Sequence, residues 1–363
     1  MSTKQMCVHF TECNGCPKME YSYENQCQEK QNNLAQFFGQ NIQFEKSENQ
    51  FFYRNKLELA FLNRKLGLRR KENFQETFSL QHCLLMSEKA NQVARFLEKK
   101  LNEFNLTGKV KYAVLRETKR TNQFLISLVS NTLEIEKEIE QIANDCLKEL
   151  KLTGLVWILN DTLSDTSQGK LIKTFGENFL EEHFMNLRFK MGHNTFFQAN
   201  IVQAEKLFTD LVNRVPEGQN ILDLYCGVGA LTLPLAQKSF KVLGIEFEEN
   251  SVQLAQENAK LNGIGNAEFI AGSARKVLKD LDFETDFVCL DPPRAGAEKK
   301  TIQRIAERKP KKVFYVSCNP VTLCRDIEWF KESNYALESI KGFDFFPNTN
   351  HMECLAVLEP MKP

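Results

Sequence analysis

The second half of the chain alternates between short apolar runs and segments with helical spacing. The apolar runs lie at residues 221–224, 241–245, 268–271, 286–290, 313–316 and 354–358, and helical spacing marks residues 199–215, 255–262 and the segment opened by the glycines at 227 and 229. Short strands that alternate with helices are typical of a mostly parallel, doubly wound sheet. We therefore predict a Rossmann-like α/β domain over residues 191–363.

The pattern before residue 190 is mixed. Its predicted elements are strands at 110–115, 123–129 and 155–159 and an amphipathic helix at 133–150. These elements predict a smaller α+β central domain over residues 91–190. Residues 1–90 are expected to hold a cysteine-rich segment and the start of that central domain.

Polar, potentially reactive side chains fall near the ends of the predicted strands. Asp223 lies near the end of the first strand, Glu246 follows the second, and Asp291 and Cys318 follow two later ones. Ligands of doubly wound sheets bind at the carboxyl ends of the strands, so these side chains are expected to converge. A lone cysteine is more often a buried structural residue, but Cys318 in this company is a candidate nucleophile that attacks an electrophilic carbon.

The segment after the first strand has the pattern Asp-x-x-x-Gly-x-Gly, from Asp223 to Gly229. Glycines there let the backbone approach a ligand at the start of a helix, and Glu246 after the next strand suits the hydroxyls of a ribose. The dinucleotide fingerprint requires a third glycine, whereas this chain has Thr232. The pattern resembles that of S-adenosylmethionine-dependent methyltransferases instead.

A loop rich in Pro and Asn leads into the last predicted strand. Glu353 lies at the start of that strand and is a candidate general base, while His351 is a candidate for orienting a neighbouring group. A carboxylate in this position is often only a solvated or capping residue.

Composition adds constraints on partners and location. The 363 residues carry no net formal charge, which excludes a globally basic nucleic-acid-binding protein, but residues 54–71 and 299–312 each hold seven Lys or Arg and one acidic residue. The chain has neither a signal-peptide core nor an apolar stretch of membrane-spanning length. We therefore expect a cytoplasmic protein without a membrane partner, and no feature indicates an obligate protein partner.

The chain has eleven cysteines, an odd number that argues against a disulfide framework in a chain without a secretory signal. Cys7, Cys13 and Cys16 lie within ten positions of one another, and Cys83 or Cys27 would complete a set of four. Zinc and iron–sulfur clusters both accept four cysteines. A single Cys-x2-Cys pair with dispersed partners favours the cluster.

Several segments occur together in the order typical of RNA (uracil-C5)-methyltransferases, and the chain resembles that family. They are residues 196–200 (FFQAN), 223–229 (DLYCGVG), 291–296 (DPPRAG), 317–323 (SCNPVTL) with 325–326 (RD), and 351–353 (HME), with weaker likeness at 53–56 (YRNK) and 165–169 (DTSQG). The N-terminal cysteines resemble those of the iron–sulfur members of the family, whose bacterial representatives methylate 23S ribosomal RNA.

The resemblance implies methylation of C5 of a uridine in 23S ribosomal RNA, with S-adenosylmethionine as methyl donor and a covalent adduct between a cysteine and uracil C6. It implies that Cys318 is the nucleophile and Glu353 the base. The cofactor contacts it implies are Gln198, Tyr225, Gly227, Glu246 and Asp291, of which Gln198 and Asp291 also approach the uracil. The ligands it implies for a [4Fe-4S] cluster are Cys7, Cys13, Cys16 and Cys83.

Three features depart from the family pattern. Many relatives carry an N-terminal oligonucleotide-binding barrel, the TRAM domain, whereas here the cysteine motif begins at residue 7. The resemblance is therefore to the branch without this domain, in which the central and methyltransferase domains must bind the RNA. Ala230 stands where Asn is common, and Ser273 stands where an acidic or amide side chain commonly contacts adenine.

Other functions remain open at this point. The same chemistry on the T-loop uridine of transfer RNA would use the same catalytic residues. A catalytically inactive RNA-binding protein would not need both Cys318 and Glu353. A radical S-adenosylmethionine enzyme usually has Cys-x3-Cys-x2-Cys, whereas the first gap here is five residues.

Overall fold

The computed structural model describes residues 6–39 and 42–362, which form two compact units. Unit 1 comprises the described residues up to Glu20, together with Asn49–Glu182 and Met191–Asn194. Unit 2 comprises the remaining described residues. The segments expected from the sequence (1–90, 91–190 and 191–363) follow chain order, whereas each compact unit is assembled from separate stretches.

Unit 1 is built on a mixed sheet that is packed against two helices. Its strands are β2 (Lys56–Leu62), β3 (Lys65–Gly67), β4 (Val110–Glu117), β5 (Phe124–Ser130), β6 (Gly154–Leu159) and β7 (Lys170–Gly176), and its helices are α2 (Glu88–Glu103) and α3 (Glu136–Glu149). Within the described residues the strand order is β3-β2-β4-β5-β6-β7, and β5–β6 is the parallel pair. The strands and the amphipathic helix expected here are confirmed.

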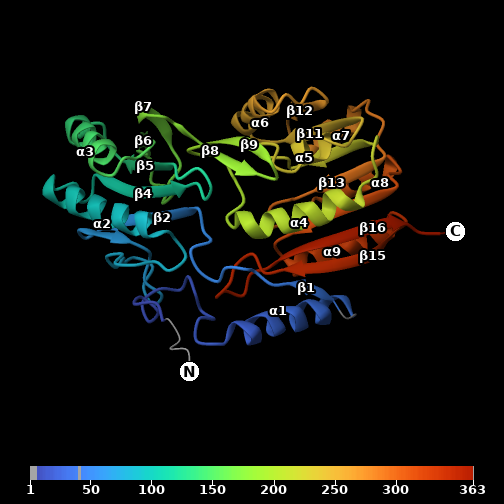
Figure 1. Ribbon diagram of the computed structural model, residues 1–363, viewed down its shortest axis with the longest axis horizontal. Coiled ribbons are helices and arrows are strands. Elements are labelled where there is room, and N and C mark those ends of the chain that lie inside the picture. Colours follow the sequence, from blue (N-terminus) through green and yellow to red (C-terminus); the bar gives the residue numbers. More distant parts are fainter. Residues whose placement is uncertain (1–5, 40–41, 363) are drawn as a thin grey trace. The chain divides into compact units, whose positions relative to one another are not determined.

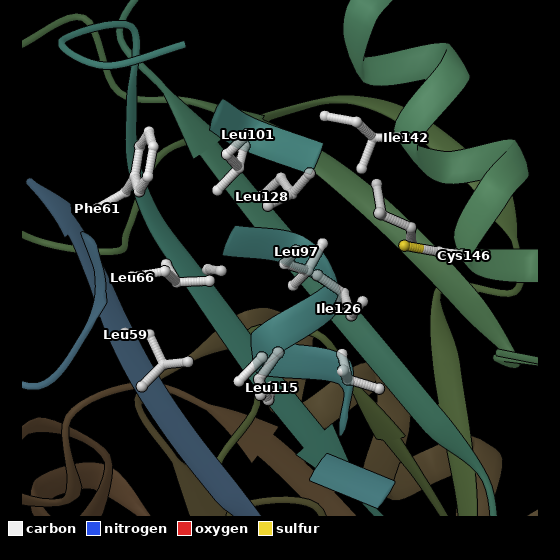
Figure 2. Packing of buried hydrophobic residues seen from close by; sticks show 14 of the residues in the cluster. Leu59, Phe61, Leu66, Leu97, Leu101, Leu115, Ile126, Leu128, Ile142 and Cys146 are labelled. Atoms are coloured by element: carbon white, nitrogen blue, oxygen red, sulfur yellow. The ribbon is translucent and has the colours of Figure 1, made fainter. Parts of the chain in front are cut away.

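The core of unit 1 lies between this sheet and its two helices (Figure 2). Leu97 and Leu101 of α2 and Ile142 and Cys146 of α3 pack with strand residues such as Leu115, all of them buried. Burying a Leu or Ile side chain contributes roughly 1.5–3 kcal/mol. Cys146 is fully buried among these core residues and is therefore a structural cysteine.

Unit 2 is a doubly wound α/β unit, as expected. Its strands are β1 (Gln43–Glu45), β10 (Asn220–Leu224), β11 (Lys241–Glu246), β12 (Ala267–Ala271), β13 (Phe287–Leu290), β14 (Lys312–Ser317), β15 (Tyr335–Phe343) and β16 (Glu353–Pro360). Its helices are α1 (Tyr23–Phe38), α4 (Ile201–Arg214), α5 (Thr232–Ala236), α6 (Glu249–Leu261), α7 (Ala274–Asp280), α8 (Lys299–Glu307) and α9 (Pro320–Glu332). A separate hairpin consists of β8 (Phe179–Phe184) and β9 (Leu187–Gly192). Residues 183–190 of this hairpin belong to unit 2, and its other residues belong to unit 1.

Among the described residues the large sheet has the order β1-β15-β16-β14-β13-β10-β11-β12. The strands from β10 to β14 are parallel, and β16 lies antiparallel between β14 and β15. Apolar residues of α1, α7, α8 and α9 cover one face. Leu222 and Leu224 of β10 pack on this face, so Asp223 between them points to the opposite face. Thr232 of α5 bonds Asp223, which places α5 on that opposite face.

The N-terminal segment adds to the edge of this sheet. Strand β1 pairs in parallel with β15, and Figure 1 shows β1 beside β15, with α1 next to it. The sequence predicted neither β1 nor β15. No helix in the described part of the chain is long and apolar enough to cross a membrane.

Candidate active site

The strand order brings the candidate nucleophile and the candidate base together. Strand β14 ends at Ser317, which pairs with Cys354 near the start of the antiparallel strand β16. Cys318 follows β14 and Glu353 begins β16, so the register places these two residues at the same end of neighbouring strands. This proximity was not deducible from their separation in the sequence.

Asp291 joins the same end of the sheet. It follows β13, the parallel neighbour of β14. On its other side β13 pairs with β10. The strands that follow β10 in the chain, β11 and β12, lie on one side of it, whereas β13 and β14 lie on the other side, so the strand order reverses between β10 and β13. Crevices at such a reversal are the usual ligand sites of doubly wound sheets. Gln198 extends the cluster, because its side-chain nitrogen donates a hydrogen bond to Asp291 Oδ2 at 3.2 Å.

The electrostatics of the cluster reflect burial and mutual proximity. Burial raises the pKa of the Cys318 thiol to about 11, with the carboxyl groups of Glu353 and Asp291 adding to the rise and Arg294 opposing it. Burial also raises the pKa of Asp291 to about 7, against the hydrogen bond from Gln198. The pKa of Glu353 lies well above its ordinary value because of burial and the neighbouring Asp291. A high pKa makes a carboxylate a stronger base once it is ionised.

The glycine-rich turn after β10 leaves open space beside its backbone. Tyr225, Gly227 and Gly229 have φ values of +64°, +54° and +86°. A Cβ atom at Gly227 would meet no atom within 4 Å. Glu246 is fixed beside the turn, since its Oε2 accepts a hydrogen bond from the Gly227 amide at 3.0 Å. A ligand can therefore approach this backbone closely.

This turn borders a cavity in unit 2 that is open to solvent, and its empty space, with the solvent at its mouth included, is about 380 Å³. Gln198, Tyr225, Gly227 and Asp291 line the cavity, and Ala230 is part of its wall. Ser273 is not among the lining residues; it stands at the N-cap of α7 without a side-chain capping bond. Four of the five expected cofactor residues thus line one cavity, while Glu246 contacts its wall through Gly227.

Thr232 has a structural role that the sequence did not indicate. Its hydroxyl donates a hydrogen bond to Asp223 Oδ2 at 2.5 Å, and Asp223 is almost fully buried. Burial raises the pKa of Asp223 to about 7, and the bond from Thr232 opposes that rise. Thr232, which stands where the dinucleotide fingerprint has its third glycine, therefore holds the carboxyl group of Asp223 in place.

A second buried carboxylate, Asp326 of α9, ties the loop after Asp291 to the helix after Cys318. Asp326 Oδ2 accepts hydrogen bonds from the Ala297 amide at 2.8 Å and the Tyr315 hydroxyl at 2.5 Å. The side chain of Asn319, which follows the candidate nucleophile Cys318, donates to the Arg294 carbonyl at 3.2 Å. These contacts hold the DPPRAG loop beside Cys318.

The candidate cluster cysteines lie together in unit 1. Cys7, Cys13, Cys16 and Cys83 all line one cavity, whose other walls are mainly apolar. Burial raises the pKa of Cys16 to about 12, and Cys83, Cys13 and Cys7 each add to the rise. Cys27 does not line this cavity; it is buried in α1, with Sγ 3.9 Å from Asp344 Oδ2. Of the two candidate fourth cysteines, the structure brings Cys83 to the other three.

Backbone amides point at two of these sulfur atoms. The His9 amide donates to Cys7 Sγ at 3.4 Å, and the Gly15 amide donates to Cys13 Sγ at 3.2 Å. Within the described residues no group of three or more His, Cys, Asp or Glu side chains is arranged to hold a single metal ion. Each thiolate of a [4Fe-4S] cluster bonds a different iron atom, so its ligands need not converge on one point.

The chain is similar to known proteins over most of its length. The sequence model of the family described as tRNA (Uracil-5-)-methyltransferase matches residues 22–361. An uncharacterized RNA methyltransferase of Caldanaerobacter subterraneus subsp. tengcongensis is 32% identical, over 97% of this chain and 84% of that protein. The tRNA (uracil(54)-C(5))-methyltransferase of Pyrococcus horikoshii is 31% identical, over 97% and 85% of the two chains.

A solved structure supports the same relationship. The tRNA (uracil-54, C5)-methyltransferase of Pyrococcus abyssi, in complex with S-adenosyl-L-homocysteine, superposes with a TM-score of 0.84. It is 29% identical in sequence, and the match covers 95% of this chain and 86% of that one. The class I methyltransferase fold expected from the sequence is thereby confirmed.

Proposed function

Because the chain belongs to the tRNA (uracil-5-)-methyltransferase family, we propose that it methylates C5 of a uridine in RNA, with Cys318 as nucleophile and Glu353 as base. The observation that carries this assignment is the pairing of Ser317 with Cys354, which puts the two residues at one end of neighbouring strands. An inactive RNA-binding protein would have no use for this arrangement.

The chemistry needs a nucleophile and a base that act in sequence, because uracil C5 is a poor nucleophile. Cys318 first loses its proton, and its thiolate bonds to C6, which moves the C5=C6 electron pair toward the O4 carbonyl. C5 then takes the methyl group. The Glu353 carboxylate removes the C5 proton, the double bond re-forms, and the bond between C6 and Cys318 breaks. One proton is released overall for each methyl group transferred.

The cavity beside the glycine-rich turn is the proposed cofactor site. S-adenosylmethionine, when bound, supplies the electrophilic methyl group. The open space at Gly227 and the positioned carboxylate of Glu246 suit an adenosine moiety with its two ribose hydroxyls. Tyr225 contributes to the same wall, while Gln198 and Asp291 join this site to the proposed uracil site. The exposed ring of Phe196, also on the wall, suits stacking with an unpaired base.

Two classes of RNA substrate have support. The N-terminal cysteine set resembles that of enzymes acting on 23S ribosomal RNA, which makes a uridine of that RNA the first candidate. The similarity to the Pyrococcus transfer RNA enzymes favours uridine 54 of transfer RNA as the second. The T-loop presents its uridine in a loop, where a base leaves its stack at low cost, and a loop uridine of 23S ribosomal RNA would have the same advantage.

Incorporation of a labelled methyl group tests the function and separates the substrates. We expect the purified protein to transfer tritiated methyl from S-adenosylmethionine to one RNA class, giving 5-methyluridine on nuclease digestion and mass spectrometry. Unmodified 23S ribosomal RNA and unmodified transfer RNA transcripts are assayed in parallel, each with a control transcript carrying cytidine at the target position. Failure to label either RNA would contradict the proposal.

We also propose that Cys7, Cys13, Cys16 and Cys83 hold a [4Fe-4S] cluster. Four thiols on one apolar-walled cavity, with amides directed at two of the sulfurs, supply the ligands and the hydrogen bonds that such clusters use. When bound, the cluster would cross-link the N-terminal loop to the segment around Cys83 in unit 1.

Anaerobic purification tests the cluster. We expect a brown protein with close to four iron and four sulfide per chain, and a Cys16→Ser variant that loses most of both. Cys146→Ser, which changes a cysteine of the unit 1 core outside this cavity, is expected to retain them. A colourless protein containing zinc alone would refute this part of the proposal.

A further inference from the structure

The proposed base is preceded by a segment that is irregular yet buried. Residues 344–352 connect β15 to β16 without helix or strand, and Glu353 follows directly. Asp344, Phe345 and Asn348 are each at most 2% exposed. Buried polar groups need hydrogen-bond partners, and this segment, here called the base loop, obtains them from elements far away in the sequence.

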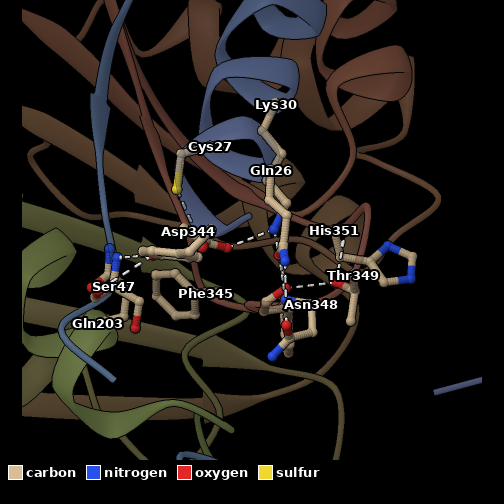
Figure 3. Close-up of polar contacts among 12 residues, drawn as sticks. Gln26, Cys27, Lys30, Ser47, Gln203, Asp344, Phe345, Asn348, Thr349 and His351 are labelled. Carbon is tan, nitrogen blue, oxygen red and sulfur yellow. Dashed lines mark hydrogen bonds and ion pairs between the residues drawn. The ribbon is translucent and has the colours of Figure 1, made fainter. Parts of the chain in front are cut away.

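Helix α1 supplies an ion pair to the start of the base loop (Figure 3). Lys30 Nζ lies 2.6 Å from Asp344 Oδ1, with side chains that are 4% and 0% exposed. Lys30 also donates to the Phe346 carbonyl at 3.0 Å. Removing one member of a buried pair leaves the other charge uncompensated, so this contact fixes where the loop starts.

One turn earlier on α1, Gln26 binds the middle of the base loop. Its side-chain oxygen accepts from the Asn348 amide at 2.8 Å, and its side-chain nitrogen donates to Asn348 Oδ1 at 3.3 Å. Asn348 has a φ of +68°, a left-handed conformation that few residues other than Gly and Asn adopt readily. Gln26 therefore contacts the loop at its conformationally most specific residue.

The third support comes from the segment that carries Gln198. Asn200 caps α4 and donates from its side chain to the Phe345 carbonyl at 3.0 Å. A further contact comes from β1, where the Glu45 carbonyl accepts a hydrogen bond from the Asp344 amide at 2.9 Å. The FFQAN segment thus contacts Asp291 through Gln198 and the base loop through Asn200.

We infer that α1 is a clamp on the base loop, in which Gln26 and Lys30 are positioning residues for proton abstraction by Glu353. This inference rests on the proposed function. A base acts only within hydrogen-bond reach of its proton, and a displacement of about 1 Å can cost about 100-fold in rate. Addition of Cys318 to C6 and transfer of the methyl group do not use Glu353. Loosening the clamp therefore slows only the last step: the C5–H bond persists, the C6–Sγ bond is not broken, and the methylated RNA stays attached to Cys318.

The test compares two identical substitutions on the same helix. Gln26→Met removes both contacts with Asn348 and also the hydrogen bond that the Gln26 side chain donates to the Tyr21 carbonyl. Gln28→Met changes an exposed residue whose side chain bonds Asn32 on the helix surface. We expect Gln26→Met to lower steady-state turnover about 10-fold or more, with the first-turnover rate of methyl transfer within about twofold of wild type. The methylated adduct then accumulates as a shifted band on a denaturing gel. Gln28→Met is expected to match wild type in all three measurements.

A second variant guards against simple misfolding. Asn348→Gly keeps the left-handed backbone and the backbone amide that binds Gln26, and it removes the side chain that carries the Oδ1 acceptor, so the same adduct is expected at a lower level. Unchanged turnover in Gln26→Met without accumulated adduct would overturn the clamp alone. An equal fall in first-turnover rate and steady-state turnover would also overturn it, because that pattern indicates a structural role. A wild-type protein that neither forms the adduct nor methylates RNA would overturn the proposed function, and the clamp with it.

Discussion

Replacing Cys318 with Ala is expected to abolish methylation of RNA and formation of the covalent adduct. Loss of a nucleophile costs on the order of 10⁴-fold or more in turnover, because uracil C5 is not activated unless C6 carries the thiolate. The side chain is half-buried and outside the set that lines the cofactor cavity, so the affinity for S-adenosylmethionine should change little. Label transfer to RNA, adduct gels and calorimetric binding of the cofactor measure the three quantities.

Cys324→Ala is the matched control for this change. Cys324 lies in α9, six residues after Cys318, and its sulfur is 3.9 Å from the carbonyl of Phe37 in α1. We expect near wild-type activity from this variant. Substantial methylation by Cys318→Ala would remove Cys318 from the mechanism, whatever the control shows.

Replacing Glu353 with Gln is expected to trap the methylated RNA on the protein. The amide keeps the size of the side chain but does not take up the C5 proton, so elimination slows by about 10²–10⁴-fold. Addition and methyl transfer proceed, and a labelled protein–RNA species should be visible on a denaturing gel within the first turnover. Mass spectrometry of the nuclease-treated adduct should locate on Cys318 a nucleotide that carries the added methyl group at C5, keeps its C5 proton and is joined to the sulfur through C6.

The matched control is Glu359→Gln, the same change at the far end of β16, where the side chain is partly exposed. It should neither trap RNA nor slow turnover. Because burial and Asp291 raise the pKa of Glu353, the basic carboxylate form becomes more abundant as the pH rises, so release of product by the wild-type protein should accelerate with pH. Unchanged activity in Glu353→Gln with no trapped species would exclude Glu353 as the base.

Local sequence was sufficient for the elements that surround the site. The β-branched runs that became β10, β11, β13 and β14 are short and bounded by turn residues, so hydrophobic periodicity predicted them. Asp291 and Cys318 come directly after predicted strands. Because parallel strands end at the same edge of a sheet, the two residues were expected to lie near each other. The choice between Cys83 and Cys27 could not be made in this way, because it depends on which residue the fold brings to the N-terminal cysteines.

The supports of the site were not predictable from local patterns. Gln26 and Lys30 lie in a segment for which the sequence predicted no helix, yet both are buried against a loop that follows them by more than 300 residues. Thr232 and Asp326 likewise gain their roles only through the carboxyl or amide groups that folding places next to them.

The sequence by itself determined the doubly wound sheet, the candidate site residues at its strand ends and the resemblance to a family. The sheet follows from hydrophobic periodicity along short stretches of chain, and the resemblance rests on motifs that are each local in sequence. Tertiary structure alone decided that Glu353 meets Cys318, that Cys83 rather than Cys27 joins the N-terminal cysteines, and that α1 holds the base loop. Each of these depends on strand register or on contacts between distant segments, for which local sequence carries no signal.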